Sequence, residues 1–369
     1  QCQPPEHRPN ILLIAVDALR ADMLDPRWMP NVSEFADDSQ VFANHYSGGN
    51  STKAGGFSLF YGLPSTYWEA FEGTQTPPVW IERLQKLGYQ PEILSAATLI
   101  SPAFDRTVFA GIDDIRLNPP GEEAWQRDRL ITDDWLDFTA ARSEDAAPFF
   151  GFLFYKSVHG YSVPPDFPRI EPYWETVNHL ALDEDFDPTP YFNRYKTATR
   201  YVDQLIGRVL DDLDKRGLLD DTIVMVTSDH GEEFNDNGEN YWGHGSNYSD
   251  AQLKVPMVVH WPGKEAGTFT RRTSHADVPA TFMKSALGCS ATPARSYASG
   301  SGLFSSQQRE WAIAGSYMNY AIVTGDRLIV TYPTGHYETM TTELEPAPGY
   351  DPPAGMLHDV LRELSRFYQ

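Results

Sequence analysis

Cysteine is almost absent from this chain of 369 residues, which contains only Cys2 and Cys289. Two cysteines are too few for a disulfide-rich scaffold or for a metal site made of thiolates. The sequence leaves open whether these two form a disulfide with each other.

Basic residues and long apolar runs are also scarce. The 29 Lys and Arg residues face 51 Asp and Glu residues, for a net charge of −22. Because no basic cluster suits a phosphate backbone, we expect no nucleic-acid partner, and the acidic excess alone is typical of a soluble protein. The acidic run at residues 183–187 lacks the glycine and distal glutamate of a calcium loop, so we interpret it as solvated. The apolar run at 11–16 is far shorter than the ~20 residues that cross a membrane.

The rest of the composition, with 41% hydrophobic and 13% aromatic residues, is that of a globular protein. Short apolar runs alternate with stretches of helical periodicity, which predicts an α/β fold with a doubly wound, mostly parallel sheet flanked by helices. The expected strands are residues 11–16, 90–95, 149–155, 223–228 and 255–260, and the expected helices are 78–87, 128–141 and 191–216. After residue 300 we expect a small antiparallel sheet and a helix over 356–368, so we divide the chain into domains 1–300 and 301–369.

Metal-ligating side chains follow several of these strands. Asp17 comes directly after the first strand, and Asp229 and His230 follow the strand at 223–228. His159 lies within a few residues of the strand at 149–155, and His244 lies in the loop before 255–260. Ligands of open α/β sheets bind outside the carboxyl ends of the strands. The sequence therefore predicts a metal at this edge of the sheet.

A hydroxyl of interest lies in the small, polar, glycine-rich segment 45–57, which leads into residues suited to opening a helix. Thr52 in this segment is either an ordinary helix cap or a nucleophile. A hydroxyl at a helix start lies among free backbone N–H groups, where an anion is stabilised. A nearby metal would lower the pKa of the hydroxyl and favours the nucleophile.

These motifs resemble those of the sulfatase and alkaline-phosphatase superfamily. Val-Asp-Ala-Leu-Arg at 16–20 resembles its opening motif, and Ser-Asp-His-Gly-Glu at 228–232, with Trp-Gly-His-Gly at 242–245, resembles the second metal motif and its downstream histidine. Residues 154–164 resemble the substrate-histidine segment, and 274–281 resemble a later helix motif. Sulfatases carry Cys-x-Pro-Ser-Arg with a Thr-Gly pair that ends ten positions after the Cys. Because Gly62 lies ten positions after Thr52, Thr52 occupies the place of that cysteine.

Two departures from the sulfatase pattern bear on the chemistry. Formylglycine is made from cysteine or serine, so Thr52 cannot supply it, and Ala18 stands where sulfatases have a second Asp, which implies one metal. A threonine nucleophile is similar to that of lipoteichoic-acid synthases and phosphoethanolamine transferases. Residues 45–64 look most like the YejM/PbgA inner-membrane proteins, in which a sulfatase-like periplasmic domain follows transmembrane helices and helps control lipopolysaccharide levels. This implies a periplasmic domain of a bacterial inner-membrane protein whose membrane anchor is missing from this chain.

The expected site follows from the residues and the resemblance together. One divalent ion, zinc or manganese ahead of magnesium or calcium because of the imidazole, is expected between Asp17, Thr52, Asp229 and His230. Thr52 is expected to attack a phosphoryl group, with His159 and His244 binding its oxygens or protonating the leaving alcohol. The candidates for substrate binding, from their nearness to Thr52 in sequence, are His45, Asn50 and Lys53.

Three functions are compatible with this sequence. The first is a metal-dependent hydrolase or transferase that acts on phosphate esters, such as phospholipid or lipopolysaccharide head groups. The second is a non-catalytic or weakly catalytic regulatory domain that binds lipid or a protein partner. The third is a sulfuric ester hydrolase, which Thr52 argues against.

Overall fold

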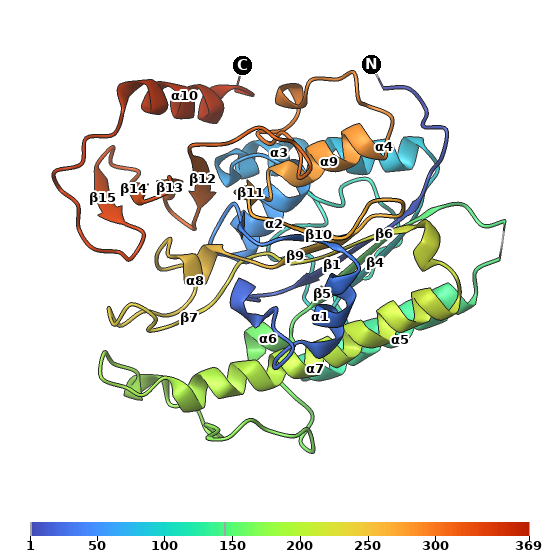
Figure 1. Ribbon diagram of the computed structural model, residues 1–369, viewed down its shortest axis with the longest axis horizontal. Coiled ribbons are helices and arrows are strands. Elements are labelled where there is room, and N and C mark those ends of the chain that lie inside the picture. The colour runs from blue at the N-terminus through green and yellow to red at the C-terminus, as the bar shows by residue number, and fades with distance from the viewer. Residues whose placement is uncertain (1, 144, 369) are drawn as a thin grey trace.

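The computed structural model describes residues 2–143 and 145–368. Its centre is a seven-stranded sheet of order β10-β2-β9-β6-β1-β5-β4 (Figure 1). In that order the strands are Gly267–Phe269, Gln40–Phe42, Met257–His260, Thr222–Ser228, Asn10–Val16, Phe149–Tyr155 and Gln90–Ser95. β6, β1, β5 and β4 are parallel neighbours. The structure thus confirms the predicted doubly wound, mostly parallel sheet.

The strand predicted at 255–260 is β9, and its direction differs from that of the other expected strands. β9 runs antiparallel to both β6 and β2. The loop after β6 stays at the carboxyl edge, so β9 must run back across the sheet and carries His260 to the opposite end, beside Val224. The three-residue strands β2 and β10 were not predicted, because so short a run has no readable periodicity.

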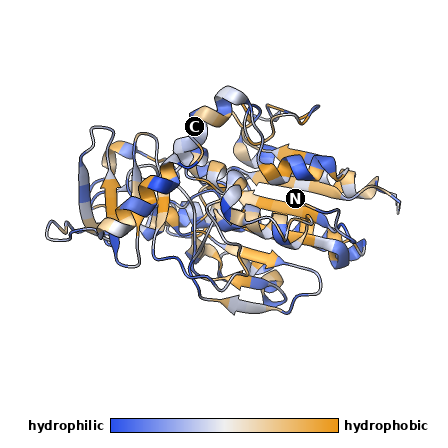
Figure 2. Ribbon diagram, turned by 90° about the horizontal axis from the view of Figure 1, so that it is seen from above, coloured by the Kyte–Doolittle hydropathy of each residue, from blue (hydrophilic) through white to orange (hydrophobic). Residues whose placement is uncertain are grey.

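Two helical layers cover the sheet, as Figure 1 shows. Along β1, Ile11, Leu13 and Ala15 pack into one hydrophobic cluster, and Leu12, Ile14 and Val16 pack into the other. A strand buried on both faces reads as a continuous apolar run, and Figure 2 shows the central strands largely in the hydrophobic colour. One layer contains α1 (Pro30–Asp37), α5 (Ala124–Ala140) and α7 (Thr189–Lys215), and the other contains α2 (Thr52–Tyr61), α3 (Trp68–Thr74), α4 (Val79–Lys86) and α9 (Asp277–Ser285).

Shorter elements gather at the carboxyl edge of the sheet. The helices α6 (Ser157–Gly160) and α8 (Asp250–Leu253) follow loops that leave this edge. Two small ribbons lie nearby: β3 (His45–Tyr46) pairs with β11 (Thr273–Ser274), and β7 (Glu233–Phe234) pairs with β8 (Trp242–Gly243). These elements position the loops that carry the candidate site.

The C-terminal subdomain is a four-stranded antiparallel sheet with one helix, as the sequence predicts. Its strands are β12 (Ala312–Gly315), β13 (Tyr320–Val323), β14 (Arg327–Thr331) and β15 (Tyr337–Thr341), and its helix is α10 (Ala354–Ser365). Val360 of α10 packs against one face of this sheet. The first strand docks onto the main domain through a bridge between Gly49 and Gly315.

Cys2 and Cys289 form a disulfide, which settles the pairing that the sequence leaves open. The bond ties the first residues to the loop after α9. Gln3 N–H donates to Gly288 O at 2.8 Å beside it.

Candidate metal centre and active site

The ends of β1 and β6 place two carboxylates side by side. Val16 is level with Ser228 in the parallel register, so Asp17 and Asp229 leave the sheet at the same height. Ala18 then turns the chain with a positive φ of 64°, and its N–H donates to Asp229 Oδ1 at 3.1 Å. Both carboxylates are buried.

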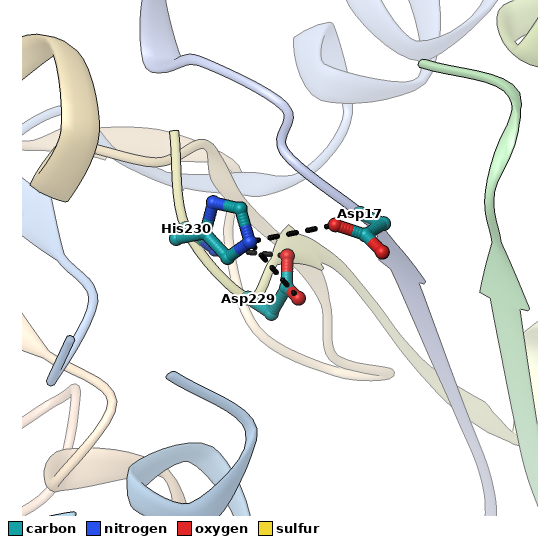
Figure 3. Close-up of side chains that lie close together, drawn as sticks. All are labelled: Asp17, Asp229 and His230. Atoms are coloured by element: carbon teal, nitrogen blue, oxygen red, sulfur yellow. Dashed lines mark hydrogen bonds and ion pairs between the residues drawn. The ribbon is translucent and has the colours of Figure 1, made fainter. Parts of the chain in front are cut away.

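His230 completes a cluster whose three ligand atoms lie within 4.8 Å of one another. His230 Nε2 lies 3.4 Å from Asp17 Oδ1 and 3.6 Å from Asp229 Oδ2. Figure 3 shows the imidazole and the two carboxylates pointing toward one another. These two carboxylate oxygens are buried and have no hydrogen-bond partner among the described residues. Buried polar atoms of this kind are normally satisfied, so two orphaned anionic oxygens facing an imidazole nitrogen fit a divalent cation.

The electrostatics of the cluster favour positive charge at this point. Burial by itself lowers the pKa of His230, but the carboxylates of Asp229 and Asp17 raise it to about 9. Burial and the neighbouring Asp17 raise the pKa of Asp229. The Nδ1 atom of His230 lies 2.7 Å from Gly231 O, which fixes the N–H on Nδ1 and leaves Nε2 as the ligand atom.

Thr52 is the first residue of α2, and Ser51 takes the N-cap position. Thr52 Oγ1 lies 3.4 Å from His230 Nε2, so the hydroxyl faces the cluster. This approach depends on Gly55, because a Cβ there would collide with the backbone oxygen of Asp229. The structure therefore brings the four predicted metal ligands together at one point.

Lys156 belongs to the site and was missed in the sequence. It follows β5 directly, and its Nζ lies 2.6 Å from Asp17 Oδ2. Burial by itself raises the pKa of Asp17, but Lys156 and the nearby histidines hold it well below its usual range. The sequence pattern that predicts Asp17 and Asp229 also applies to Lys156, because all three residues follow a buried parallel strand.

His159 and His244 are the two other histidines predicted for the site. Both line a cavity of about 510 Å³ together with Asp17, Thr52 and Lys156. Their ring centroids are 5.1 Å apart, and burial lowers the pKa of His159. The arrangement presents two imidazoles to any group bound at Thr52.

A carboxylate that the sequence reasoning did not single out orients His244. Glu232 Oε2 lies 3.0 Å from His244 Nδ1, and Tyr161 Oη donates to Glu232 Oε1 at 2.8 Å. The pairing leaves His244 Nε2 to face the cavity. Glu232 lies inside the quoted Ser-Asp-His-Gly-Glu motif, but Tyr161 has no local signal that connects it to the site.

The three predicted substrate-binding residues lie in different surroundings. Lys53 lines the cavity, although its Nζ pairs with Glu69 at 2.9 Å. Asn50 is buried, and its amide donates to Asn247 O at 2.7 Å. His45 is also buried, with Nδ1 2.9 Å from Thr273 Oγ1, because β3 turns its ring toward β11. The structure does not bring Asn50 or His45 into the lining of the cavity.

Comparison with known proteins identifies the superfamily to which these residues belong. The Sulfatase family model matches residues 9–288. The chain belongs to the sulfatase family. The inner membrane protein YejM of Salmonella typhimurium is 29% identical over 359 residues, which cover 97% of this chain and 55% of that protein. Human iduronate 2-sulfatase is 35% identical over 98 residues, which cover 25% of this chain and 17% of that protein.

Solved structures share the fold of the sulfatase domain. The phosphonate monoester hydrolase of Agrobacterium radiobacter has a TM-score of 0.69 at 17% identity, covering 97% of this chain and 96% of that one. The lipoteichoic acid synthase LtaP of Listeria monocytogenes has a TM-score of 0.64 at 13% identity, covering 99% and 92%. Both likenesses confirm the expected alkaline-phosphatase and sulfatase architecture.

The chain spans about half the length of its YejM relatives, which are inner membrane proteins. Within residues 2–143 and 145–368, no helix combines the length and the apolarity that a membrane crossing requires.

Proposed function

We propose that this domain is a metal-dependent hydrolase or transferase of phosphate esters with Thr52 as its nucleophile. The observation that carries the proposal is the position of the Thr52 hydroxyl, at a helix start and 3.4 Å from His230 Nε2, beside two buried carboxylate oxygens that have no hydrogen-bond partner among the described residues. Formylglycine chemistry would need a cysteine or serine at this position. Both cysteines of the chain are instead joined to each other in a disulfide.

Asp17, Asp229 and His230 would hold the metal, with Thr52 as the fourth ligand. A divalent ion bound there lowers the pKa of a coordinated hydroxyl and neutralises phosphoryl charge. Zinc and manganese suit this mixture of oxygen and nitrogen donors best.

The side chains around the cavity supply the remaining chemistry. The Thr52 hydroxyl would give its proton to solvent, Oγ1 would attack the phosphorus while the bond to the leaving oxygen breaks, and that oxygen would take a proton from His244 or His159. Water or a second alcohol then attacks the phosphothreonine and releases Thr52. We expect Lys156 and His159 to hold the phosphoryl oxygens, and their place in the lining of the cavity with Asp17 supports this.

The substrate class that we propose is a lipid head group, either of a phospholipid or of lipopolysaccharide, at the periplasmic side of an inner membrane. The likeness to YejM over 97% of the chain supports a place at that membrane. The disulfide supports an oxidising compartment, because disulfides rarely persist in a reducing cytosol.

Substitution of Thr52 tests the proposal. Thr52→Ala should remove turnover of p-nitrophenyl phosphate and bis(p-nitrophenyl) phosphate, and Thr52→Ser should keep part of it, because only the hydroxyl is required. The matched control is Thr74→Ala, which removes an exposed hydroxyl at the end of α3. A phosphorylated peptide containing Thr52 should be trapped by acid quench and mass spectrometry. Faster turnover of p-nitrophenyl sulfate than of the matching phosphate would overturn the proposal.

The second candidate function is regulation through lipid or protein binding, which the resemblance of residues 45–64 to the YejM/PbgA proteins implies. Complementation of an envelope-defective strain by the full-length protein separates the two. Full rescue by Thr52→Ala and His244→Ala, despite loss of turnover in vitro, would establish binding as the function.

A further inference from the structure

Tyr317 reaches the candidate active site from a distant part of the chain. It lies on the turn between β12 and β13 of the C-terminal subdomain, yet it lines the same cavity as Thr52, His159 and His244. Its side chain is exposed, at 65%, in contrast to the buried aromatic residues of the core. An exposed ring at the wall of a polar cavity is available to contact a bound group.

The turn that carries Tyr317 is fixed to the nucleophile loop. Asn50 N–H donates to Gly315 O at 3.1 Å, and Gly315 N–H donates to Gly48 O at 2.8 Å. On the far side of the turn, Tyr248 Oη donates to Asn319 Oδ1 at 2.8 Å. The position of Tyr317 is therefore set by the same backbone that positions Thr52.

The ring of Tyr317 lies against the loop that carries His244. A Cβ on Gly245 would lie 2.8 Å from Tyr317 Cε2, so only a glycine admits the ring at this distance. Gly245 also has a φ of +77°, a second reason for glycine here. Partial desolvation of the phenol raises the pKa of Tyr317, and the charge of Asp17 raises it further against the opposing effect of Lys156. The phenol therefore lies within the electric field of the Asp17 carboxylate.

We propose that Tyr317 is a substrate-binding residue whose ring contacts the group esterified to the phosphoryl, beside His244. This inference rests on the proposed function, since it assumes a phosphoryl group at Thr52. The C-terminal subdomain thus supplies part of the substrate site, and the site is incomplete without it. Aromatic and apolar groups should stack on the ring, as Trp68 and Phe104 line the same cavity.

Binding to a protein that cannot turn over the probe tests this role directly. In a Thr52→Ala background, we expect Tyr317→Ala to weaken the binding of bis(p-nitrophenyl) phosphate about fivefold in calorimetric titration, the scale of one lost aromatic contact. Tyr317→Phe keeps the ring and should retain the affinity of the parent. In the active protein, Tyr317→Ala should raise KM by a similar factor while Tyr317→Phe leaves it unchanged.

Met318→Ala is the matched control, because Met318 is the next residue on the turn, is 78% exposed and does not line the cavity. It should leave affinity and KM unchanged. Equal affinity of the Tyr317→Ala and parent proteins would overturn the proposal, as would an equal loss in Tyr317→Phe or no measurable binding at all. A failure of the proposed function would give a different result, because turnover would then survive the Thr52→Ala substitution.

Discussion

Lys156→Met should destabilise the domain strongly when no metal is bound. Lys156 Nζ lies 2.6 Å from Asp17 Oδ2, Asp17 is fully buried, and the lysine side chain is 23% exposed. At an effective dielectric constant of about 20, two unit charges about 3 Å apart attract by roughly 5 kcal/mol. The methionine variant no longer has to bury a lysine charge, and this saving offsets part of the lost attraction. We therefore expect the free energy of unfolding to fall by about 2 to 4 kcal/mol.

A bound metal should reduce this loss. The added cation provides an opposite charge for Asp17, so the methionine substitution should cost less with metal than after treatment with a chelator. By linkage, the variant should then bind the metal more tightly than the parent does. Urea unfolding with and without metal measures the loss of stability in each state, and the difference between the two losses gives the change in metal affinity.

The chain offers a matched control in Lys53→Met. Lys53 lines the same cavity, but its partner Glu69 is 81% exposed, and exposed pairs contribute about 0 to 1 kcal/mol. An equally small effect of Lys156→Met, or the same loss with and without metal, would refute the assignment of Lys156 as the cation that balances Asp17.

Three other changes probe separate parts of the molecule. Glu232→Gln should lower kcat about 10- to 100-fold with unchanged metal content, because it loosens His244, and full activity in steady-state assays would contradict that role. Burial lowers the pKa of His275 to about 4, so the unfolded chain takes up a proton below about 6.5 and the folded protein does not. The free energy of unfolding should therefore fall by up to ~3 kcal/mol as the pH drops from about 6.5 to about 4, and His275→Phe should flatten this slope in urea titrations. Cys2→Ser removes a disulfide with a sequence separation of 287 residues and should cost about 2 to 5 kcal/mol, as thiol reduction of the parent protein should also show.

The sequence predicts those parts of the site that a strand end controls. Asp17, Asp229 and His230 follow buried parallel strands, and the register of a parallel sheet then brings them to one edge. Lys156 obeys the same rule and was overlooked only because a lysine after a strand is usually a solvated side chain. For these residues, local pattern and sheet topology together determine the position.

Nearness to Thr52 in sequence predicts membership of the site less well than a position at a strand end, as His45 and Asn50 show. Both lie within a few residues of Thr52, but the ladder between β3 and β11 and the bond to Asn247 O turn them into the protein interior. Tyr317 illustrates the opposite case. It is 265 positions from Thr52 in sequence and reaches the site because Gly315 bridges to Gly49, a tertiary contact that leaves no periodic trace in the sequence.

The charge of the cavity predicts that substrate binding depends on a bound metal. Every Lys and Arg side chain that lines the cavity pairs with a carboxylate, and the pairs are Lys156 with Asp17, Lys53 with Glu69 and Arg106 with Glu72. Asp229 adds a further carboxylate beside Asp17, in a chain whose net charge is −22. The protein side chains therefore provide no excess positive charge for a phosphoryl anion, and a bound dication would supply it. Chelation should then abolish the binding of inorganic phosphate as well as turnover, while removal of the half-buried cation Lys53, which is paired with Glu69, should change either one little.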